Sequence, residues 1–420
     1  MENWVAKDCV CPDCGSQIHA VKEFRQWYPT CEWNIGKFDP ADGDSWIERI
    51  FRDQGVSHGN RLYEEIRTSS PEALRPKWTA SRILATILSL SVHLLTAALA
   101  LAGGYFLIFG WPSIPQILLG LTCLVLFFLM RPRFGKAPEN GLSRHQAPSL
   151  FSLCDRIADQ VGSPRPDLII VDEDFNAAFG QVGFPRKTVL WIGLPLWEVL
   201  DWEERVAVLA HEFSHGANGD ATRGFFMHSA LLALAALLDY LRQPYDPDAT
   251  IFEMVTHYFL WGLSWLVLPL LWLMLILLWR DSQRAEFLAD YLATSASGTQ
   301  AMKTSLSKLA LSDQFHHFAS KNIVSTRQSG REILKRSLSH LQNLPACELD
   351  RLSRLSQKED ARLDATHPPT CQRIGFIQSH FVDNPTIRIE DEERNAITAE
   401  FEAQKDHVGT SLIQLWAPDR

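Results

Sequence analysis

Two long stretches of this chain lack charged side chains altogether. No Asp, Glu, Lys or Arg occurs in the 48 residues from Ile83 to Met130, or in the 26 residues from Met254 to Trp279. A buried core helix is the alternative, but apolar runs of this length favour membrane helices of about 20 residues each. The first stretch, with turn signals at Gly103-Gly104 and in residues 111–115, predicts two spans, and the second predicts one.

Other features are missing as well. The sequence has no internal repeats, no low-complexity tracts and no basic patch that would suit nucleic acid, and its net charge of −9 over 420 residues is modest. The polar, cysteine-bearing N-terminus does not resemble a cleavable signal peptide. We therefore expect two to three domains, a lipid bilayer around part of the chain, and no nucleic-acid partner.

Cysteine is scarce over most of the chain, but four of the eight cysteines lie near the N-terminus, at Cys9, Cys11, Cys14 and Cys31. The Cys11–Gly15 segment is typical of a zinc knuckle, in which a tight turn directs two thiolates at one ion. A complete ribbon repeats the pair about 15–20 residues later, whereas Tyr28 stands here where one of those cysteines is expected. We predict a zinc-ribbon-like module with a structural zinc on these four cysteines. A degenerate site or a small fold without metal is the alternative, and disulfides are the least expected use.

The segment His211-Glu212-Phe213-Ser214-His215 carries the H-E-x-x-H arrangement of zinc peptidases. Residues four apart share a helix face, so both histidines can reach one metal ion, and Glu212 is placed to take a proton from a water. A capping box at Asp201 and Glu204 and an apolar stripe at helical spacing predict the helix. A surface helix with two incidental histidines is the alternative, which this context disfavours.

Two histidines leave a catalytic zinc site one ligand short, because such sites usually have three protein ligands and one open position. Residues 284–290 offer Glu286 and Asp290, which are four apart and therefore share a helix face. Glu286 is the candidate third ligand. Asp290 is a candidate for a carboxylate that does not bind the metal itself but hydrogen-bonds to a ligand and orients it. Acidic residues at this spacing are also common on solvated helices.

These motifs, in this order, resemble those of the HtpX and CAAX-prenyl-protease family of membrane-embedded zinc endopeptidases, in the gluzincin group. Asn176-Ala177-Ala178-Phe179 resembles the family's substrate-binding Asn-Ala segment. Residues 208–215 resemble its zinc helix, and residues 286–290 its third-ligand helix. His367-Pro368-Pro369 with Arg373-Ile374 resembles its late His-Pro segment. The resemblance covers roughly residues 140–380.

The resemblance implies a role for each of these residues. It implies His211, His215 and Glu286 as ligands of a catalytic Zn²⁺ and Glu212 as the general base. It suggests that His367 and Arg373 stabilise the reacting carbonyl or support the metal site. It also favours Asn176 and Ala177 as substrate-binding residues over an ordinary turn.

The membrane topology follows from the ligands. If His211, His215 and Glu286 bind one zinc, both motifs lie on the same side of the membrane. The span at 254–279 separates them, so residues 222–241 must make a second crossing. This gives four spans in two hairpins. Lys and Arg are frequent at the span ends that join the soluble segments, whereas the loop between spans three and four has only Arg242. Because positive charge is enriched on the cytoplasmic side, this pattern predicts that the soluble parts are cytoplasmic. We expect the membrane to be a bacterial inner membrane.

Residues 167–171 and 187–192 predict two short strands joined by a glycine-containing loop. A peptide substrate can bind by adding a strand to an exposed sheet edge, where main-chain hydrogen bonds give affinity that tolerates many sequences. Asn176 lies beside this edge in the sequence. Metal-assisted hydrolysis would follow, with Glu212 passing the proton to the leaving amine.

The expected fold is mainly α, with four transmembrane helices, a cytoplasmic gluzincin-type protease domain with a small β-sheet, and the N-terminal module. The predicted segments are 1–40 (zinc-ribbon-like module), 41–81 (polar linker), 82–130 (first hairpin), 131–221 (edge strands and zinc helix), 222–279 (second hairpin), 280–382 (third ligand and His-Pro segment) and 383–420 (acidic tail).

Three functional hypotheses follow. The first is an integral membrane zinc endopeptidase that cleaves membrane proteins or their cytoplasmic segments, in membrane protein quality control. The second is a CAAX-type protease that processes lipid-modified C-termini. Proteases of that branch have a larger helical chamber, so the four spans predicted here fit the HtpX-like arrangement better. The third is a catalytically silent membrane adaptor that binds clients through the N-terminal ribbon, which the intact motifs disfavour. The sequence leaves the substrate and the oligomeric state open.

Overall fold

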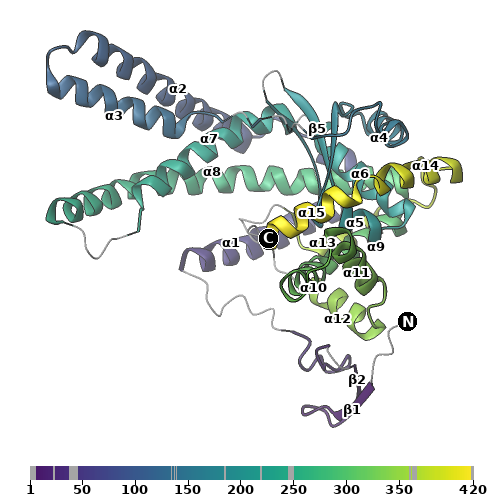
Figure 1. Ribbon diagram of the computed structural model, residues 1–420. Coiled ribbons are helices and arrows are strands. Elements are labelled where there is room, and N and C mark those ends of the chain that lie inside the picture. Colours follow the sequence, from purple (N-terminus) through teal and green to yellow (C-terminus); the bar gives the residue numbers. More distant parts are fainter. Residues whose placement is uncertain are drawn as a thin grey trace. The chain divides into compact units, whose positions relative to one another are not determined.

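A computed structural model of the chain shows a mainly helical protein with two small sheets (Figure 1). It describes residues 6–21, 24–36, 46–133, 135–136, 138, 140–183, 186–217, 220–244, 250–358, 361 and 367–417. The chain divides into two compact units. Unit 1 comprises Met1–Arg75, Lys136–Asn218 and Ala285–Arg420, and unit 2 comprises Pro76–Gly135 and Gly219–Arg284.

Unit 2 contains the uncharged stretches. Its helices are α2 (Ala80–Phe109), α3 (Ile114–Met130), α7 (Asp220–Leu241) and the first part of α8 (Ile251–Ser297). By length and composition, α2 and α8 can each cross a membrane, whereas α3 and the Phe225–Leu241 part of α7 are shorter apolar helices. Two of the four predicted spans therefore have the full character of a membrane helix.

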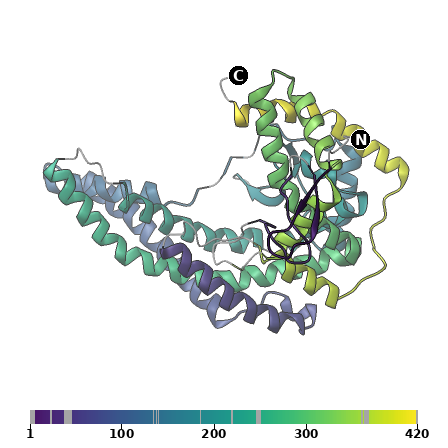
Figure 2. The same ribbon diagram turned by 90° about the horizontal axis from the view of Figure 1, so that it is seen from below.

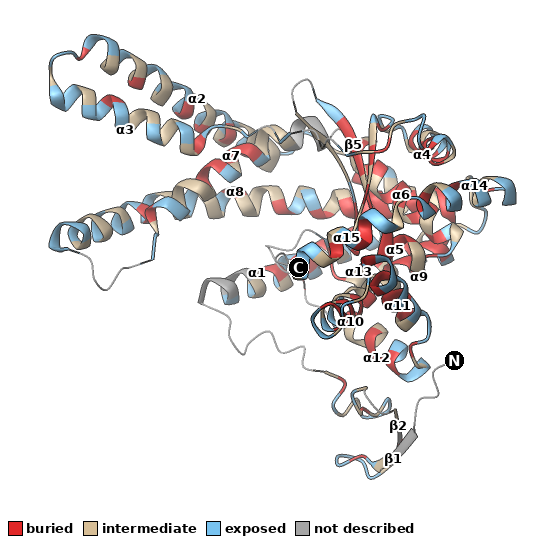
Figure 3. Cartoon of the chain, viewed as in Figure 1, coloured by how far each residue is buried: buried red, intermediate tan, exposed pale blue. Residues whose placement is uncertain are grey.

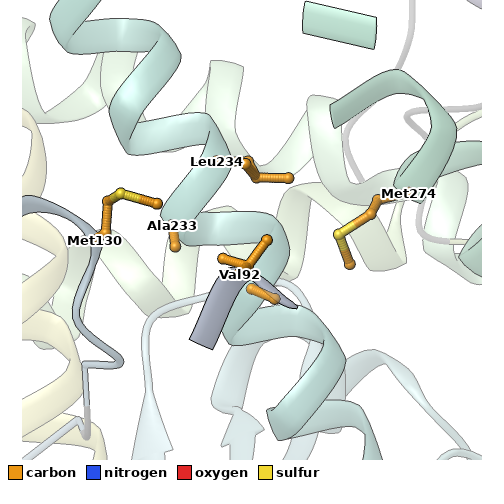
Figure 4. Close-up of a cluster of buried hydrophobic side chains, with 6 residues drawn as sticks. Val92, Met130, Ala233, Leu234 and Met274 are labelled. Carbon is orange, nitrogen blue, oxygen red and sulfur yellow. The ribbon is translucent and has the colours of Figure 1, made fainter. Parts of the chain in front are cut away.

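The helices of unit 2 meet in a small apolar cluster that brings side chains together from all four of them (Figure 4). Its buried members are Val92, Met130, Ala230, Ala233, Leu234 and Met274. The helices also share a polar contact, since an imidazole nitrogen of His93 lies 3.0 Å from the Phe226 carbonyl oxygen. Away from the cluster, large apolar side chains such as Leu101 and Leu266 are exposed. A lipid environment favours this arrangement, in which apolar side chains face outward and polar groups bond to one another between the helices.

Unit 1 is built around a three-stranded sheet of order β3-β5-β4. β3 (Leu168–Asp172) and β5 (Lys187–Gly193) are the predicted strands, and they pair in parallel. Within the predicted loop lies a further strand, β4 (Ala177–Val182), which pairs antiparallel with β5 and leaves its other side as a sheet edge. The run Ala177–Gly180 has no β-branched residue, so propensity did not reveal the strand, and only its pairing with β5 specifies it.

The remaining helices of unit 1 pack against this sheet or against one another (Figures 1 and 2). They are α1 (Trp46–Arg67), α4 (Pro148–Val161), α5 (Leu194–Val199), α6 (Trp202–Ala217), the end of α8, α9 (Thr299–Lys308), α10 (Ser312–Ser325), α11 (Gly330–Gln342), α12 (Ala346–Ser356), α13 (Thr370–Ser379), α14 (Asp391–Glu402) and α15 (Lys405–Trp416). Two short 3-10 helices lie at Pro71–Leu74 and Leu309–Leu311. The helix α1 lies in the predicted linker and contacts α13.

The acidic tail is folded onto the rest of unit 1. Both of its helices bury apolar side chains, which appear red in Figure 3. Phe401 of α14 is 2% exposed and stacks on Trp197 of α5 with ring centroids 4.4 Å apart. The Glu400 carboxylate accepts hydrogen bonds from the Ser149 and Leu150 backbone N–H groups, both at 2.9 Å, and so caps the start of α4.

The N-terminal module is a β-hairpin followed by a loop. β1 (Ala6–Val10) and β2 (Gln17–Val21) pair antiparallel, and the loop of residues 24–36 contacts α12. The buried interior of the module is small, since its apolar cluster has only Cys11 and Ile18 as buried members, whereas Trp27 and Ile35 are buried where the loop contacts α12.

Candidate active site

Helix α6 carries the H-E-x-x-H motif. At its start the Glu204 carboxylate accepts a hydrogen bond from the Asp201 backbone N–H at 2.7 Å, as the predicted capping box requires. Lys308 of α9 donates to the same carboxylate at 2.6 Å, so this buried acid has a charged partner. The apolar stripe is buried against the core, with Phe213 0% exposed. The helix is thereby held at its first turn by hydrogen bonds and along its apolar side by packing. Together these contacts fix the direction in which the two histidine side chains point.

Three of the predicted ligands converge on one point. The Nε2 atoms of His211 and His215 are 3.3 Å apart, and they lie 3.5 Å and 3.4 Å from the two carboxylate oxygens of Glu286 on α8. Ligands at about 2.1 Å from a tetrahedral ion lie about 3.4 Å from one another. The three side chains therefore fit a single zinc ion, although His215 and Glu286 are 71 positions apart in the sequence.

Asp290 and Arg373 support this triangle from behind. An Asp290 carboxylate oxygen lies 3.0 Å from Nδ1 of His211, which leaves Nε2 facing the other two ligands. The Arg373 guanidinium of α13 donates two hydrogen bonds to Asp290, at 2.6 and 2.9 Å. Both side chains are buried. A buried carboxylate between an imidazole and a guanidinium is charge-compensated, so the network holds the His211 ring in one orientation.

The protonation of the site follows from these contacts. Burial lowers the pKa of His215 to about 4, so at neutral pH this imidazole is in the neutral form that binds metal. Burial also acts to lower the pKa of His211, but hydrogen bonds with Asp290 and Glu286 outweigh it and raise the pKa to about 9. A metal ion that binds here displaces a proton from His211.

Glu212 and His367 lie at the same centre. Burial raises the pKa of Glu212, against the opposing charges of His211 and His367. A carboxylate with a raised pKa is a better proton acceptor, which suits a general base. His367 is more exposed, and its Nδ1 atom lies 2.5 Å from an oxygen of Glu286. Its ring thus stands at the rim of the site rather than in its floor.

The edge strand β4 is fixed beside the motif helix. Asn176 is exposed just before the strand, and its backbone carbonyl accepts a hydrogen bond from the Gly193 N–H at 2.8 Å. Phe179 of β4 contacts Phe213 of α6 edge to face, with ring centroids 4.9 Å apart. A Cβ on Gly216 would lie only 2.5 Å from the Phe179 ring, so the strand approaches α6 where glycine follows the second histidine.

Gly216 and Lys308 belong to this arrangement and were missed in the sequence. The glycine next to the second histidine carried a local signal, since glycine is unfavourable within a helix unless another group must approach closely. Lys308 carried no local signal, because its partner Glu204 is 104 residues away in the chain.

Three of the four N-terminal cysteines also come together. The sulfur atoms of Cys11, Cys14 and Cys31 all lie within 4.8 Å of one another. Cys9 lies outside this group, and its sulfur is 3.5 Å from the Gln26 side-chain oxygen. The structure therefore gathers three of the predicted thiolates and leaves the fourth elsewhere.

The chain is similar to several known proteins. A curated protein named "Protease HtpX homolog" from Gemmatimonas aurantiaca is 23% identical over 242 residues, which cover 57% of this chain and 77% of that protein. A relative of the same name from Syntrophobacter fumaroxidans is 26% identical over 250 residues, covering 57% and 78%. One from Salinibacter ruber is 34% identical over 79 residues, covering 19% and 29%. No solved structure gives a significant match.

The family comparison takes in all the residues of the metal-ligand cluster. Residues 144–380 match the model described as Peptidase family M48. This range is more than half of the 420 residues and contains α6, the end of α8 and the His367–Arg373 segment. The cluster therefore lies inside the matched region, and the chain belongs to peptidase family M48.

Proposed function

We propose that this chain is an integral membrane zinc endopeptidase that hydrolyses peptide bonds of membrane proteins or of their cytoplasmic segments, in membrane protein quality control. The observation that carries the proposal is the triangle of His211, His215 and Glu286, whose donor atoms have the mutual distances of zinc ligands. Membership of family M48, whose members depend on zinc, supports the metal, and the apolar helices α2 and α8 support the membrane location.

In this proposal His211, His215 and Glu286 would hold the ion, which when bound would activate a water and polarise the scissile carbonyl. Glu212 would act as the general base that accepts a proton from the attacking water and delivers it to the leaving amine. His367 stands at the exposed rim, where its ring can donate a hydrogen bond to the carbonyl oxygen as charge develops.

Arg373 has the other role that the resemblance left open. Its guanidinium is buried, is bound to Asp290, and lies 3.4 Å from the His211 ring nitrogens. These contacts support a role for Arg373 in holding the metal site rather than in binding the substrate. The exposed edge of β4, which begins at Ala177, offers main-chain groups to an extended peptide, with the Asn176 amide beside it.

We propose four membrane crossings. Both ligand helices belong to unit 1, and the chain leaves unit 1 after Asn218 and rejoins it at Ala285. If the apolar part of α8 crosses the bilayer once, the chain must cross once more to return to the same side, and α7 is the helix available. The same reasoning pairs α2 with α3. Lys and Arg near the span ends favour a cytoplasmic unit 1.

Replacement of Glu212 by Gln tests the mechanism. The amide keeps the shape of the side chain but accepts a proton poorly, so we expect bound zinc and folding to persist while proteolysis falls by about two to four orders of magnitude. The measurement is cleavage of a denatured membrane protein by purified variant, with zinc counted in the same sample.

Glu203→Gln is the matched control, because Glu203 lies on the same helix in an exposed ion pair with Arg394. This control should retain near wild-type cleavage. Comparable cleavage by the Glu212 variant would rule out the proposed general base, and loss of activity in both variants would point to damage to the helix.

A further inference from the structure

The cysteine cluster of the N-terminal module lies outside the family match and outside the proposed catalytic site. The sulfur atoms of Cys11 and Cys31 are 3.5 Å apart, and those of Cys31 and Cys14 are 3.6 Å apart. Thiolates at about 2.3 Å from a tetrahedral zinc ion lie about 3.8 Å from one another. Three sulfur atoms from two separate turns are therefore already at the spacing of zinc ligands.

The first turn has the backbone of a metal knuckle. The Gly15 N–H donates to the Cys11 carbonyl at 2.9 Å, and the Cys11 N–H donates to the Ser16 carbonyl at 2.8 Å. Gly15 has φ of +72°, which a residue with a Cβ rarely adopts. The turn therefore has the tight, glycine-dependent backbone of a metal knuckle and carries Cys11 and Cys14 at its two ends.

The second turn delivers Cys31 from the loop of residues 24–36. Two non-glycine residues next to it, Glu32 and Asn34, have positive φ values of 57° and 53°. Such backbone conformations are costly and persist where other contacts hold them. Here the Asn34 side chain donates to the Gln26 carbonyl at 2.7 Å, and the Tyr28 N–H donates to the Trp33 carbonyl at 3.2 Å.

This same loop is the part of the module that contacts α12. Arg351 donates to the Ile35 carbonyl and Arg354 to the Pro29 carbonyl, each at 2.8 Å. In the other direction, the Trp27 indole N–H donates to the Cys347 carbonyl at 3.1 Å. Two of these three bonds are made to backbone carbonyl groups of the loop, and the Glu32 carboxylate adds an ion pair with Lys358, so docking depends on the conformation that residues 27–35 adopt.

The module has too little interior to hold that shape unaided. Domains below about 40 residues usually need a metal, disulfides or a partner, because they bury too little apolar surface to offset chain entropy. We propose that Cys11, Cys14 and Cys31 bind one structural Zn²⁺, and that this ion holds the loop of residues 24–36 in the conformation that docks on α12. We expect a water molecule to take the fourth coordination position of this ion, since Cys14 and Cys31 are exposed to solvent and the Cys9 sulfur contacts Gln26 instead.

The test uses the purified full-length chain in detergent and has two measurements. Zinc is counted per chain, and hydrogen exchange is followed at the backbone amides of residues 24–36 and of α12. Wild type should carry two zinc ions. Cys11→Ser with Cys14→Ser should carry one, and its exchange in residues 24–36 should rise at least tenfold.

Three further variants sharpen the result. Cys9→Ser should keep both ions and wild-type exchange, because its sulfur is no ligand. Cys123→Ser, on α3, is the matched control and should change neither measurement. Arg354→Ala with Lys358→Ala removes docking contacts and should raise exchange in residues 24–36 while both ions stay bound.

The outcomes separate this proposal from the proposed catalytic zinc. His211→Ala with His215→Ala should lose one ion and keep the one bound by the cysteines. The proposal fails if the Cys11 and Cys14 double variant keeps all the zinc of wild type, or if it loses an ion with unchanged exchange in residues 24–36. Loss of the ion in Cys9→Ser would overturn the three-thiolate site in favour of four.

Discussion

At the scale of single residues, the site depends on a buried carboxylate, Asp290, whose negative charge is balanced by its neighbours. Asp290 is 0% exposed and lies between His211 and Arg373, so its charge is balanced by protein side chains. The carboxylate has a lowered pKa, because the charge of Arg373 and its hydrogen bonds outweigh the effect of burial. It therefore remains ionised at neutral pH and keeps the His211 ring oriented toward the other ligands.

Replacement of Asp290 by Asn should weaken this arrangement in two ways. We expect zinc affinity to fall by about 10- to 100-fold, because the partner that orients His211 loses its charge. We also expect stability to fall by about 3–5 kcal/mol, because Arg373 becomes an uncompensated buried cation. Competition with a metal chelator measures the affinity, and thermal unfolding measures the stability.

Asp159→Asn is the control for this change. Asp159 pairs with Arg165 at 2.7 Å on the surface, where such pairs contribute about 0–1 kcal/mol. This variant should bind zinc as wild type does. Zinc binding by Asp290→Asn that equals wild type would show that Asp290 has no part in the site.

At the scale of elements, the C-terminal helices α14 and α15 brace the region around the motif helix. They lie beyond residue 380, where the family match ends, yet they contribute buried side chains to unit 1. Arg394 of α14 bonds to Glu203 in the first turn of α6, and Glu400 caps α4. The tail is thus part of the framework that positions α4, α5 and α6.

Truncation of Phe401 to Ala should show this. Removing a fully buried aromatic ring that stacks on Trp197 costs about 3–5 kcal/mol, which corresponds to a fall in Tm on the order of 10 °C for a unit of this size. Leu415→Ala, in the same tail but 51% exposed, should change the Tm little. Equal melting temperatures for the two variants would mean that α14 does not stabilise the protein.

At the scale of the whole molecule, the proposed topology ties the membrane helices to the zinc ligands. A maleimide that cannot cross the membrane, added to intact cells, should label Asp248→Cys, between α7 and α8. It should leave His145→Cys and Lys321→Cys unlabelled until the membrane is opened. The wild-type chain is the control, since all eight of its cysteines are expected inside or within the bilayer. Labelling of Lys321→Cys but not of His145→Cys from outside would place the two parts of unit 1 on opposite sides and remove the argument for four crossings, whereas labelling of both would reverse the proposed orientation.

The sequence by itself determined what is periodic or local. The i, i+4 spacing placed His211 beside His215 and Glu286 beside Asp290, because 3.6 residues per turn puts such pairs on one face wherever a helix forms. The absence of charge identified the apolar helices, since hydrocarbon excludes ions whatever the fold. The family motifs in residues 140–380 could be recognised without knowledge of tertiary contacts, and the family match covers nearly the same region.

Only the tertiary structure decided the contacts between distant segments. It brought Glu286 to the histidines and Arg373 to Asp290, placed β4 at the sheet edge, and folded the tail onto α4 and α5. It also left the Cys9 sulfur outside the group that Cys11, Cys14 and Cys31 form, although Cys9 is closer in sequence to Cys11 than Cys31 is. These outcomes depend on which faces pack together across tens to hundreds of residues, and local propensity and spacing carry no information about that.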